Sequence, residues 1–196
     1  MMQLTYVTEL SAIVGQKLPY LKALLATAPD RVILRAKHLS EADYQSLALD
    51  LLPSSQAHGV RLIINHQVNV ARALKLPIQV SFPTSQEADL ASLTFGVSVH
   101  SYEEGKLAMA KGANWLVYGH LFTTSCKAGL APRSMAVFEA LTKLPLPVYG
   151  IGGIKMSNVH KLPKATTGVY VMRDSMVQPD PHAFTKAWRD TLAKLT

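Results

Sequence analysis

Short apolar runs alternate with longer amphipathic stretches along the whole chain, and this alternation restricts the fold more than any other feature of the sequence. The apolar runs predict strands at residues 3–8, 31–36, 60–64, 78–81, 94–99, 115–118, 147–151 and 167–172. The other stretches predict helices at residues 16–28, 41–52, 66–75, 85–92, 101–111, 133–144, 156–162 and 181–194. No linker or shift of composition divides the pattern, so we expect one domain over residues 1–196.

Eight strands that alternate with helices predict a parallel sheet with helical crossovers, and the natural closure is a (β/α)8 TIM barrel. The length of 196 residues is slightly below the usual lower size of about 200, so several helices must be short. We expect Ser40 to cap the second helix, which should end before Pro53. The alternative is an open doubly wound sheet, which normally starts with a glycine-rich turn, whereas Thr8 and Glu9 follow the first strand here.

The composition describes a well-buried globular protein and excludes disorder as the main feature, since 48% of residues are hydrophobic and 17% are charged. A single cysteine argues against a disulfide-built fold and for a reducing compartment. The N-terminus lacks the pattern of a signal peptide and no apolar run has membrane-spanning length, so we expect a cytoplasmic protein with no membrane partner. The net charge is +7, but the 20 Lys and Arg are scattered, which favours a small anionic ligand over nucleic acid.

Residues 114–133, NWLVYGHLFTTSCKAGLAPR, combine a buried strand with a loop that is unsuited to a packed interior. The loop contains His120, Thr124, Cys126 and Lys127. Because active sites of such barrels lie at the carboxyl ends of the strands, we expect this loop to carry active-site residues. The alternative is an ordinary surface loop in which His120 is merely solvated.

The second predicted strand ends with two cations on one face. Ile33, Arg35 and Lys37 alternate with Leu34 and Ala36. If the apolar pair faces the helices, both cations point into the mouth of the barrel, where like charges require an anion. Arg35 is the stronger candidate, because Lys37 could already have left the strand for solvent.

Glycines follow the seventh strand, and the eighth strand is followed by a further candidate ligand site. Adjacent Gly152 and Gly153 allow the backbone to approach a ligand, and the loops after strands seven and eight often bind phosphate. We therefore expect amides at these glycines, Met172 and Arg173 to bind phosphate. The alternative for the glycines is a tight turn before the next helix.

The remaining strand ends carry polar residues, of which we expect Asn65 and Ser98 to contact the substrate. Several imidazoles could in principle converge on a metal. However, the sequence has no His-x-His pair, and nearly all predicted strand ends lack a carboxylate, Glu9 being the exception. We therefore expect no metal. The other histidines near strand ends are interpreted as polar rim residues: His38, His66 and His100.

Three segments carry a resemblance to a known family. They are GVSVHS at residues 96–101, GHLFTTSCK at residues 119–127 with Gly129, and GIGGI at residues 150–154. Together they resemble the thiamine phosphate synthase superfamily, and more closely its TenI branch, the thiazole tautomerases. The similarity covers essentially the whole chain in the right order, and members of the family are eight-stranded α/β barrels.

The resemblance also separates the two branches. Synthases have an Asn-Asp pair after strand three and an acidic residue after strand four for the magnesium that carries the pyrimidine diphosphate. Here His66 follows Asn65, and residues 79–84 contain no carboxylate. The synthases also have Pro, Gln and Thr where this chain has His120, Ile33 and Cys126. On these grounds the resemblance implies a tautomerase.

A tautomerase of this type aromatises a carboxylated thiazole phosphate by moving a proton, and needs no cofactor. His120 occupies the slot of the proton-transferring histidine, and an imidazole titrates near neutral pH. Arg35 and Lys37 would hold the carboxylate, and Lys127 would add positive potential. Arg173 stands where family members usually have a small residue. Two alternatives remain, a thiamine phosphate synthase and a non-catalytic binder of thiamine-related phosphates, and the sequence leaves a homo-oligomer open.

Overall fold

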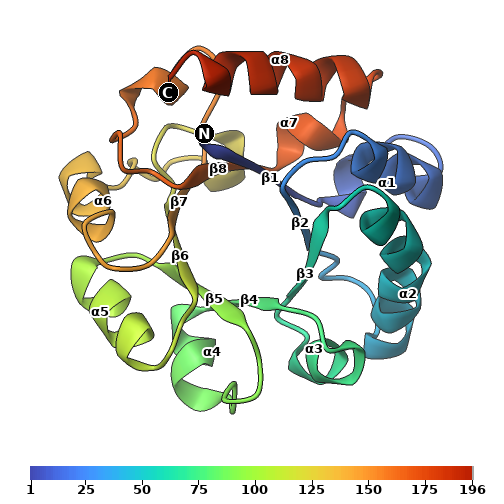
Figure 1. Cartoon of the computed structure of the whole chain (residues 1–196), viewed down its shortest axis with the longest axis horizontal. Helices are drawn as coiled ribbons and strands as arrows, with labels where there is room; N and C mark the ends of the chain where they lie inside the picture. Colours follow the sequence, from blue (N-terminus) through green and yellow to red (C-terminus); the bar gives the residue numbers. More distant parts are fainter. Residues whose placement is uncertain (196) are drawn as a thin grey trace.

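In the computed structural model of the chain, which describes residues 1–195, eight parallel strands close into a barrel in the order β1-β2-β3-β4-β5-β6-β7-β8. The helices form a ring around it (Figure 1). The strands are β1 Gln3–Val7, β2 Arg31–Leu34, β3 Arg61–Asn65, β4 Ile78–Ser81, β5 Phe95–Val99, β6 Trp115–Gly119, β7 Val148–Ile151 and β8 Gly168–Val171. The predicted (β/α)8 barrel is confirmed.

The helices mostly follow the strands in alternation. The α-helices are α1 Lys17–Ala26, α2 Glu41–Ala57, α3 Val68–Leu74, α4 Phe82–Glu87, α5 Tyr102–Ala110, α6 Met135–Leu141, α7 Arg173–Met176 and α8 Pro181–Ala193. Short 3-10 helices are η1 Leu10–Ala12, η2 Ser125–Lys127 and η3 Val159–Lys161. Ser40 caps α2 as expected, because its hydroxyl accepts a hydrogen bond from the Asp43 amide.

Apolar side chains form two separate clusters, one between the sheet and the helices and one inside the barrel. On β2, Leu34 lies in the outer cluster and Ile33 in the inner one, as the alternation predicts, and Ala36 beyond the strand also lies in the outer cluster. The inner cluster also contains Trp115, whose indole is accommodated by Gly96 on the neighbouring strand. A Cβ atom at Gly96 would lie 2.0 Å from this ring, so only glycine leaves room for it.

The end of α2 differs from the prediction, because the helix continues through Pro53 to Ala57. Proline removes the hydrogen bond to the carbonyl four residues earlier, which here belongs to Leu49. Leu49 is an exposed residue, so water can hydrate that carbonyl. Leu51 and Ser55 are buried on either side of the proline, and this packing keeps the segment helical.

Two further helices differ from the prediction. The helix expected at residues 85–92 begins at Phe82 and ends at Glu87, because Ser81 caps it and Pro83 is tolerated in its first turn. The helix expected at residues 156–162 is reduced to η3, with Pro163 shortly after it. Helix α7 was not predicted, because its four residues are too few to show a helical period.

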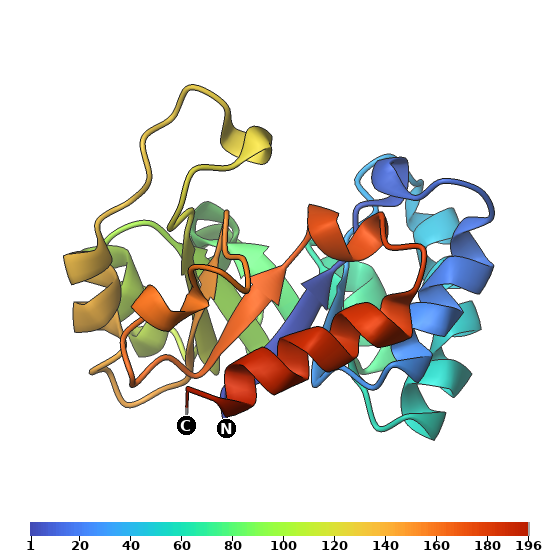
Figure 2. The same ribbon diagram turned by 90° about the horizontal axis from the view of Figure 1, so that it is seen from above.

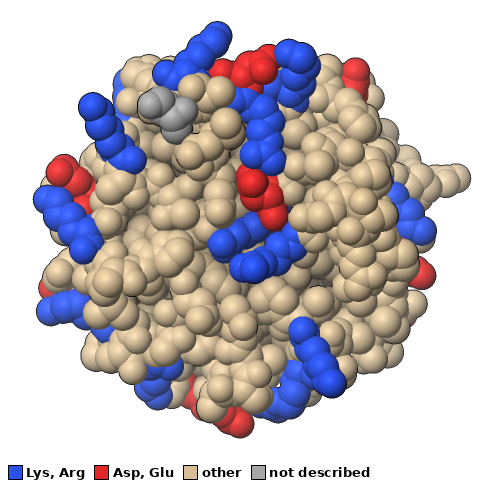
Figure 3. All heavy atoms as spheres, viewed as in Figure 1, with Lys and Arg blue, Asp and Glu red and all other residues tan. Residues whose placement is uncertain are grey.

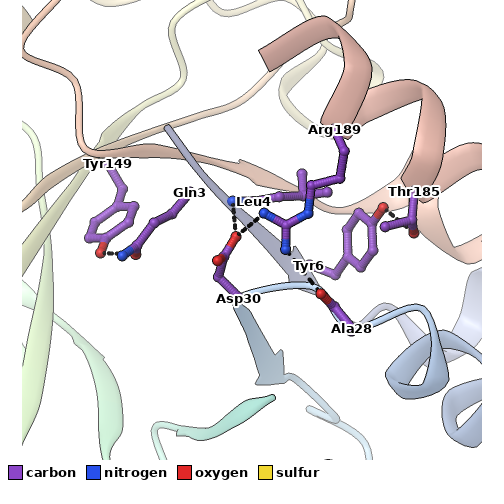
Figure 4. A network of polar contacts seen from close by, with 8 residues as sticks. All are labelled: Gln3, Leu4, Tyr6, Ala28, Asp30, Tyr149, Thr185 and Arg189. Atoms are coloured by element: carbon purple, nitrogen blue, oxygen red, sulfur yellow. Dashed lines mark hydrogen bonds and ion pairs between the residues drawn. The ribbon is translucent and has the colours of Figure 1, made fainter. Parts of the chain in front are cut away.

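The barrel has two different ends. The N-terminus lies at the end seen in Figure 1, where acidic and basic side chains lie side by side near the centre of the face (Figure 3). There Asp30 accepts hydrogen bonds from the Leu4 amide and from Arg189 of α8 (Figure 4). At the opposite end the loop between β6 and α6 extends beyond the others (Figure 2). Among the described helices, none is long and apolar enough to cross a membrane.

Candidate active site

A cavity of about 940 Å³ opens at the carboxyl ends of the strands. Its size is within the range typical of small-molecule sites, and it lies where (β/α)8 enzymes carry their active sites. Sequence-predicted residues that line it are Arg35, Lys37, Ser98, His120, Thr124, Cys126, Lys127, Gly152, Gly153, Met172 and Arg173. A second cavity, of about 690 Å³, lies at the other end between α2, α3 and the strand starts and contains none of these residues.

His120 directly follows β6 and is only 9% exposed. Its Nε2 lies 3.3 Å from the carbonyl oxygen of Leu130, and its own carbonyl accepts a hydrogen bond of 2.9 Å from the Arg133 amide. In the tautomer that carries the proton on Nε2, the ring donates to Leu130 and Nδ1 is left to accept. The loop thus holds His120 at its backbone carbonyl and at one nitrogen of its ring.

The rest of this loop presents polar groups to the cavity. The Thr124 hydroxyl accepts a hydrogen bond from the Cys126 amide and so caps η2. Cys126 is a free, exposed thiol. Lys127 lines the cavity and forms no ion pair with another described residue. The loop therefore brings one cation and two small polar side chains to the mouth.

Arg35 forms an ion pair with Glu9 at the cavity rim. The backbone amide of Arg35 also donates to the Thr8 hydroxyl at 2.7 Å, which holds the residue close to the end of β1. Partial burial tends to raise the pKa of Glu9, but a hydrogen bond from Ser11 and the charge of Arg35 outweigh it and lower that pKa. Both predicted cations line the cavity, and Arg35 has a carboxylate partner, whereas Lys37 has no ion-pair partner among the described residues.

Gly152 and Gly153 have positive φ angles of 91° and 67°. A Cβ atom at Gly152 would lie 2.3 Å from Cβ of His120, and one at Gly153 would lie 2.4 Å from the Phe122 carbonyl oxygen. The glycines are thus required by the close approach of the β6 loop as well as by their φ angles. Next to them, α7 starts at Arg173 directly after Met172, an arrangement that often binds phosphate in this fold.

The floor of the cavity contains a polar chain that continues into the barrel. Gln79 donates a hydrogen bond of 3.0 Å to the Ser98 hydroxyl, and the Trp115 indole donates one of 2.7 Å to Gln79. Asn65, which we expected to contact the substrate, is not among the residues lining the cavity. Its side-chain amide donates to the Gln79 carbonyl at 3.3 Å, so it is engaged with the neighbouring strand.

The ends of β3 and β4 do not fit the magnesium ion that the family resemblance implies for synthases. They present Asn65, His66, Gln79 and Ser81, none of which is a carboxylate, and the described residues contain no group of three or more His, Cys, Asp or Glu that could hold a metal. Burial and the nearby charges of Lys37 and Arg35 lower the pKa of His66, which favours its neutral imidazole. These two strand ends therefore lack the carboxylate oxygens that a magnesium ion usually requires.

Sequence reasoning missed the structural part played by His100. Its amide donates to Glu104 at 2.7 Å, its carbonyl accepts from Arg133 at 3.3 Å, and its ring is hydrogen-bonded to the Gly119 backbone. Burial and then the charge of Arg133 lower the pKa of His100. It thus links the ends of β5 and β6 beside His120. The position of His100 just after a predicted strand end indicated that it lies near the site. Nothing in the sequence indicated its hydrogen-bond partners.

Comparison with known sequences identifies a family. A family model described as thiamine monophosphate synthase matches residues 4–174. Thiamine-phosphate synthase of Roseiflexus castenholzii is 32% identical over 181 residues, which cover 88% of this chain and 79% of the relative. Thiamine-phosphate synthase of a second Roseiflexus species is 33% identical over 169 residues, covering 82% and 72%.

Solved structures share the barrel. Thiamine phosphate pyrophosphorylase from Pyrococcus furiosus matches with a TM-score of 0.84 at 20% identity, over 99% of this chain and 96% of that one. The 3-keto-L-gulonate-6-phosphate decarboxylase from Vibrio cholerae matches with a TM-score of 0.71 at 14% identity, over 100% and 99%. At these identities the similarity supports the fold alone.

The prediction of a thiazole tautomerase is wrong. The relatives at 31% to 33% identity are named thiamine-phosphate synthases. The prediction rested on His120 and on the missing carboxylates, but an imidazole at a cavity wall is compatible with many reactions and does not single out a proton shift. The broader resemblance, to the thiamine phosphate synthase superfamily, is confirmed.

Proposed function

The chain belongs to the thiamine monophosphate synthase family, and from this premise we propose that it forms thiamine phosphate by coupling a phosphorylated thiazole with a pyrimidine diphosphate. The relatives' names support this reaction class. The structural observation that carries the proposal is a single cavity of about 940 Å³ with basic groups at two separate corners.

One corner lies at the end of β2 and contains Arg35 and Lys37. The other is formed by the loops after β6, β7 and β8 and contains Lys127, the Gly152 and Gly153 backbone, and Arg173. Each corner can hold one phosphorylated group through charge-assisted hydrogen bonds. Coupling two anions in one cavity requires such separate cationic sites, because otherwise the substrates repel each other.

The residues contribute to coupling mainly by position and charge. Holding both substrates in one cavity makes the reaction effectively unimolecular. As the bond to the diphosphate breaks, negative charge accumulates on the leaving group, and fixed cations at the β2 corner stabilise it. His120 lies in the cavity wall, and we assign it a role in orienting the substrate through the nitrogen that does not face Leu130.

A second candidate function is non-catalytic binding of thiamine-related phosphates. It is favoured by one observation, the lack of carboxylates at the ends of β3 and β4, which the resemblance assigns to magnesium in synthases. Membership of the TenI branch, as distinct from the tautomerase reaction, stays a prediction that depends on the same positions and on His120 and Cys126. Both candidates use the same basic cavity, so binding alone does not separate them.

The test is the formation of thiamine phosphate from the two phosphorylated substrates, with excess magnesium and with excess chelator, alongside calorimetric binding of each substrate. Product formation supports the proposed synthase. Binding without product supports the second candidate, and absence of both overturns the assignment of the cavity. Lys37→Met should reduce coupling at least tenfold, whereas Lys22→Met, an exposed position on α1, serves as the matched control.

A further inference from the structure

Arg31 lies inside the barrel at the start of β2 and is only 8% exposed. Its guanidinium carbon lies 4.6 Å from the ring centroid of Tyr149 and 5.3 Å from that of Trp115. These contacts are cation–π interactions, in which a positive charge lies against an aromatic face. Because arginine is not deprotonated in proteins, a full positive charge lies here against the two aromatic rings.

No carboxylate balances this charge. None of the ion pairs among residues 1–195 involves Arg31, and its buried Nη1 makes no hydrogen bond to another described residue. Asp30 precedes it in the chain, but Oδ2 of Asp30 already accepts from the Leu4 amide at 2.7 Å and from Arg189 at 2.8 Å (Figure 4). An uncompensated buried charge is among the costliest features of a protein interior.

Two hydroxyl groups lie in the same row of paired strand positions as Arg31. Thr5 on β1 is in register with Arg31 on one side and with Tyr170 on the other. Thr5 is 0% exposed and Tyr170 is 3% exposed, and neither hydroxyl has a hydrogen bond of good geometry within the described part of the chain. The Tyr170 hydroxyl faces the Arg31 and Trp115 side chains, whose charge and polar contacts lower its pKa against the larger effect of burial.

These three groups share one chemical property. Residues in register on parallel strands point to the same side, so Arg31, Thr5 and Tyr170 project together into the barrel. A guanidinium N–H and two hydroxyls can all donate to a single acceptor. We propose that Arg31, Thr5 and Tyr170 form an internal site for one small monovalent anion of the halide class.

The choice of a monovalent anion follows from the charge. Water would satisfy the hydrogen bonds but would leave the guanidinium unbalanced, whereas a dianion would leave a buried negative charge. Tyr170 also lines the active-site cavity, so the internal site lies directly beneath the cavity floor. It differs from the cations at the mouth, where Arg35 has Glu9 as its partner. The inference is independent of the proposed reaction.

The test is thermal unfolding of the full chain at constant ionic strength, with chloride or bromide replacing gluconate, which is too large to enter. The midpoint should rise by about 3–6 °C for each tenfold increase of halide above its dissociation constant. Thr5→Val should lose most of this response. Thr166→Val is the matched control, because Thr166 is also a buried hydroxyl without a described partner but lies in the turn before β8, and it should keep the response.

A crystal of the parent protein soaked in bromide supplies a second measurement. It tests for the anion site even if Thr5→Val does not fold. An anomalous peak within hydrogen-bond distance of Arg31, Thr5 and Tyr170 supports the site. A midpoint that is independent of halide, an equal response in Thr5→Val, or water in place of bromide at this position would overturn it.

Discussion

Glu9 and Arg35 form an ion pair at the entrance of the cavity, although 26 residues separate them in the chain. The side chains are 21% and 22% exposed, so the pair is largely shielded from solvent. Its carboxylate reduces the positive potential at the β2 corner and leaves Lys37 as the cation without an ion-pair partner among the described residues. The pair therefore sets how strongly this corner attracts anions.

We expect Glu9→Gln to strengthen the binding of pyrophosphate by about threefold to tenfold, because it removes a negative charge a few ångströms from the anion site. Calorimetry at low ionic strength measures this. Glu139→Gln is the control, since Glu139 pairs with Lys143 on the exposed side of α6. Weaker binding in Glu9→Gln would show that the carboxylate is needed to orient Arg35.

The same pair gives a pH dependence of stability. The pKa of Glu9 is lowered in the folded state, so its contribution is fully present above the unfolded value of about 4.3 and is lost as pH falls through the folded value. We expect the parent to exceed Glu9→Gln by up to about 1 kcal/mol at pH 7 and to lose this advantage below about pH 4. Urea unfolding at both pH values measures it; a constant difference would contradict the assignment.

The strand pattern was predictable because β-strands of a parallel barrel are buried on both faces and read as apolar runs. The rule that active sites lie at strand ends then identified His120, Lys37 and Arg173 as cavity residues. The partners of these residues were not predictable. For example, the ion pair of Arg35 with Glu9 and the hydrogen bond of Asn65 to Gln79 depend on side-chain rotamers and on the register between strands. A periodic pattern of apolar residues predicts neither of these.

The reaction was the least predictable feature. Cations and an imidazole around a cavity indicate an anionic substrate, but they can support several reactions of phosphorylated heterocycles. The sequence therefore placed His120 at the cavity, where the structure has it, but the tautomerase reaction inferred from it was wrong. Helix α2 shows the same limit at a smaller scale, since the burial of Ser55 overrides the local effect of Pro53.

Asp30 joins α8 to the barrel through Leu4 and Arg189, and its side chain is 32% exposed. Asp30→Ala should lower the free energy of unfolding by about 1–3 kcal/mol, because it leaves a backbone amide and a guanidinium without their shared acceptor. Asp190→Ala is the matched control, since Asp190 pairs with Lys186 on the exposed surface of the same helix, and its cost should stay below about 1 kcal/mol. Equal costs for the two variants would contradict a structural role for Asp30.

The last prediction concerns Gly152, whose position links the β7 loop to His120. Gly152→Ala should destabilise the protein by about 1–3 kcal/mol and displace the loop that carries His120, because the added Cβ would lie 2.3 Å from Cβ of His120. Chemical denaturation measures the first effect, and the coupling rate measures the second. The rate should fall while the barrel remains folded, as judged by circular dichroism.

Gly129→Ala separates the contact from the backbone effect. Gly129 has a positive φ of 79°, similar to the 91° of Gly152, but a Cβ atom there would have no heavy atom within 4 Å. Both variants carry the cost of a positive φ, so the difference between them reports the approach of His120. If Gly129→Ala were as damaging as Gly152→Ala, the glycine would be required for its φ angle alone, and the contact with His120 would not control the loop.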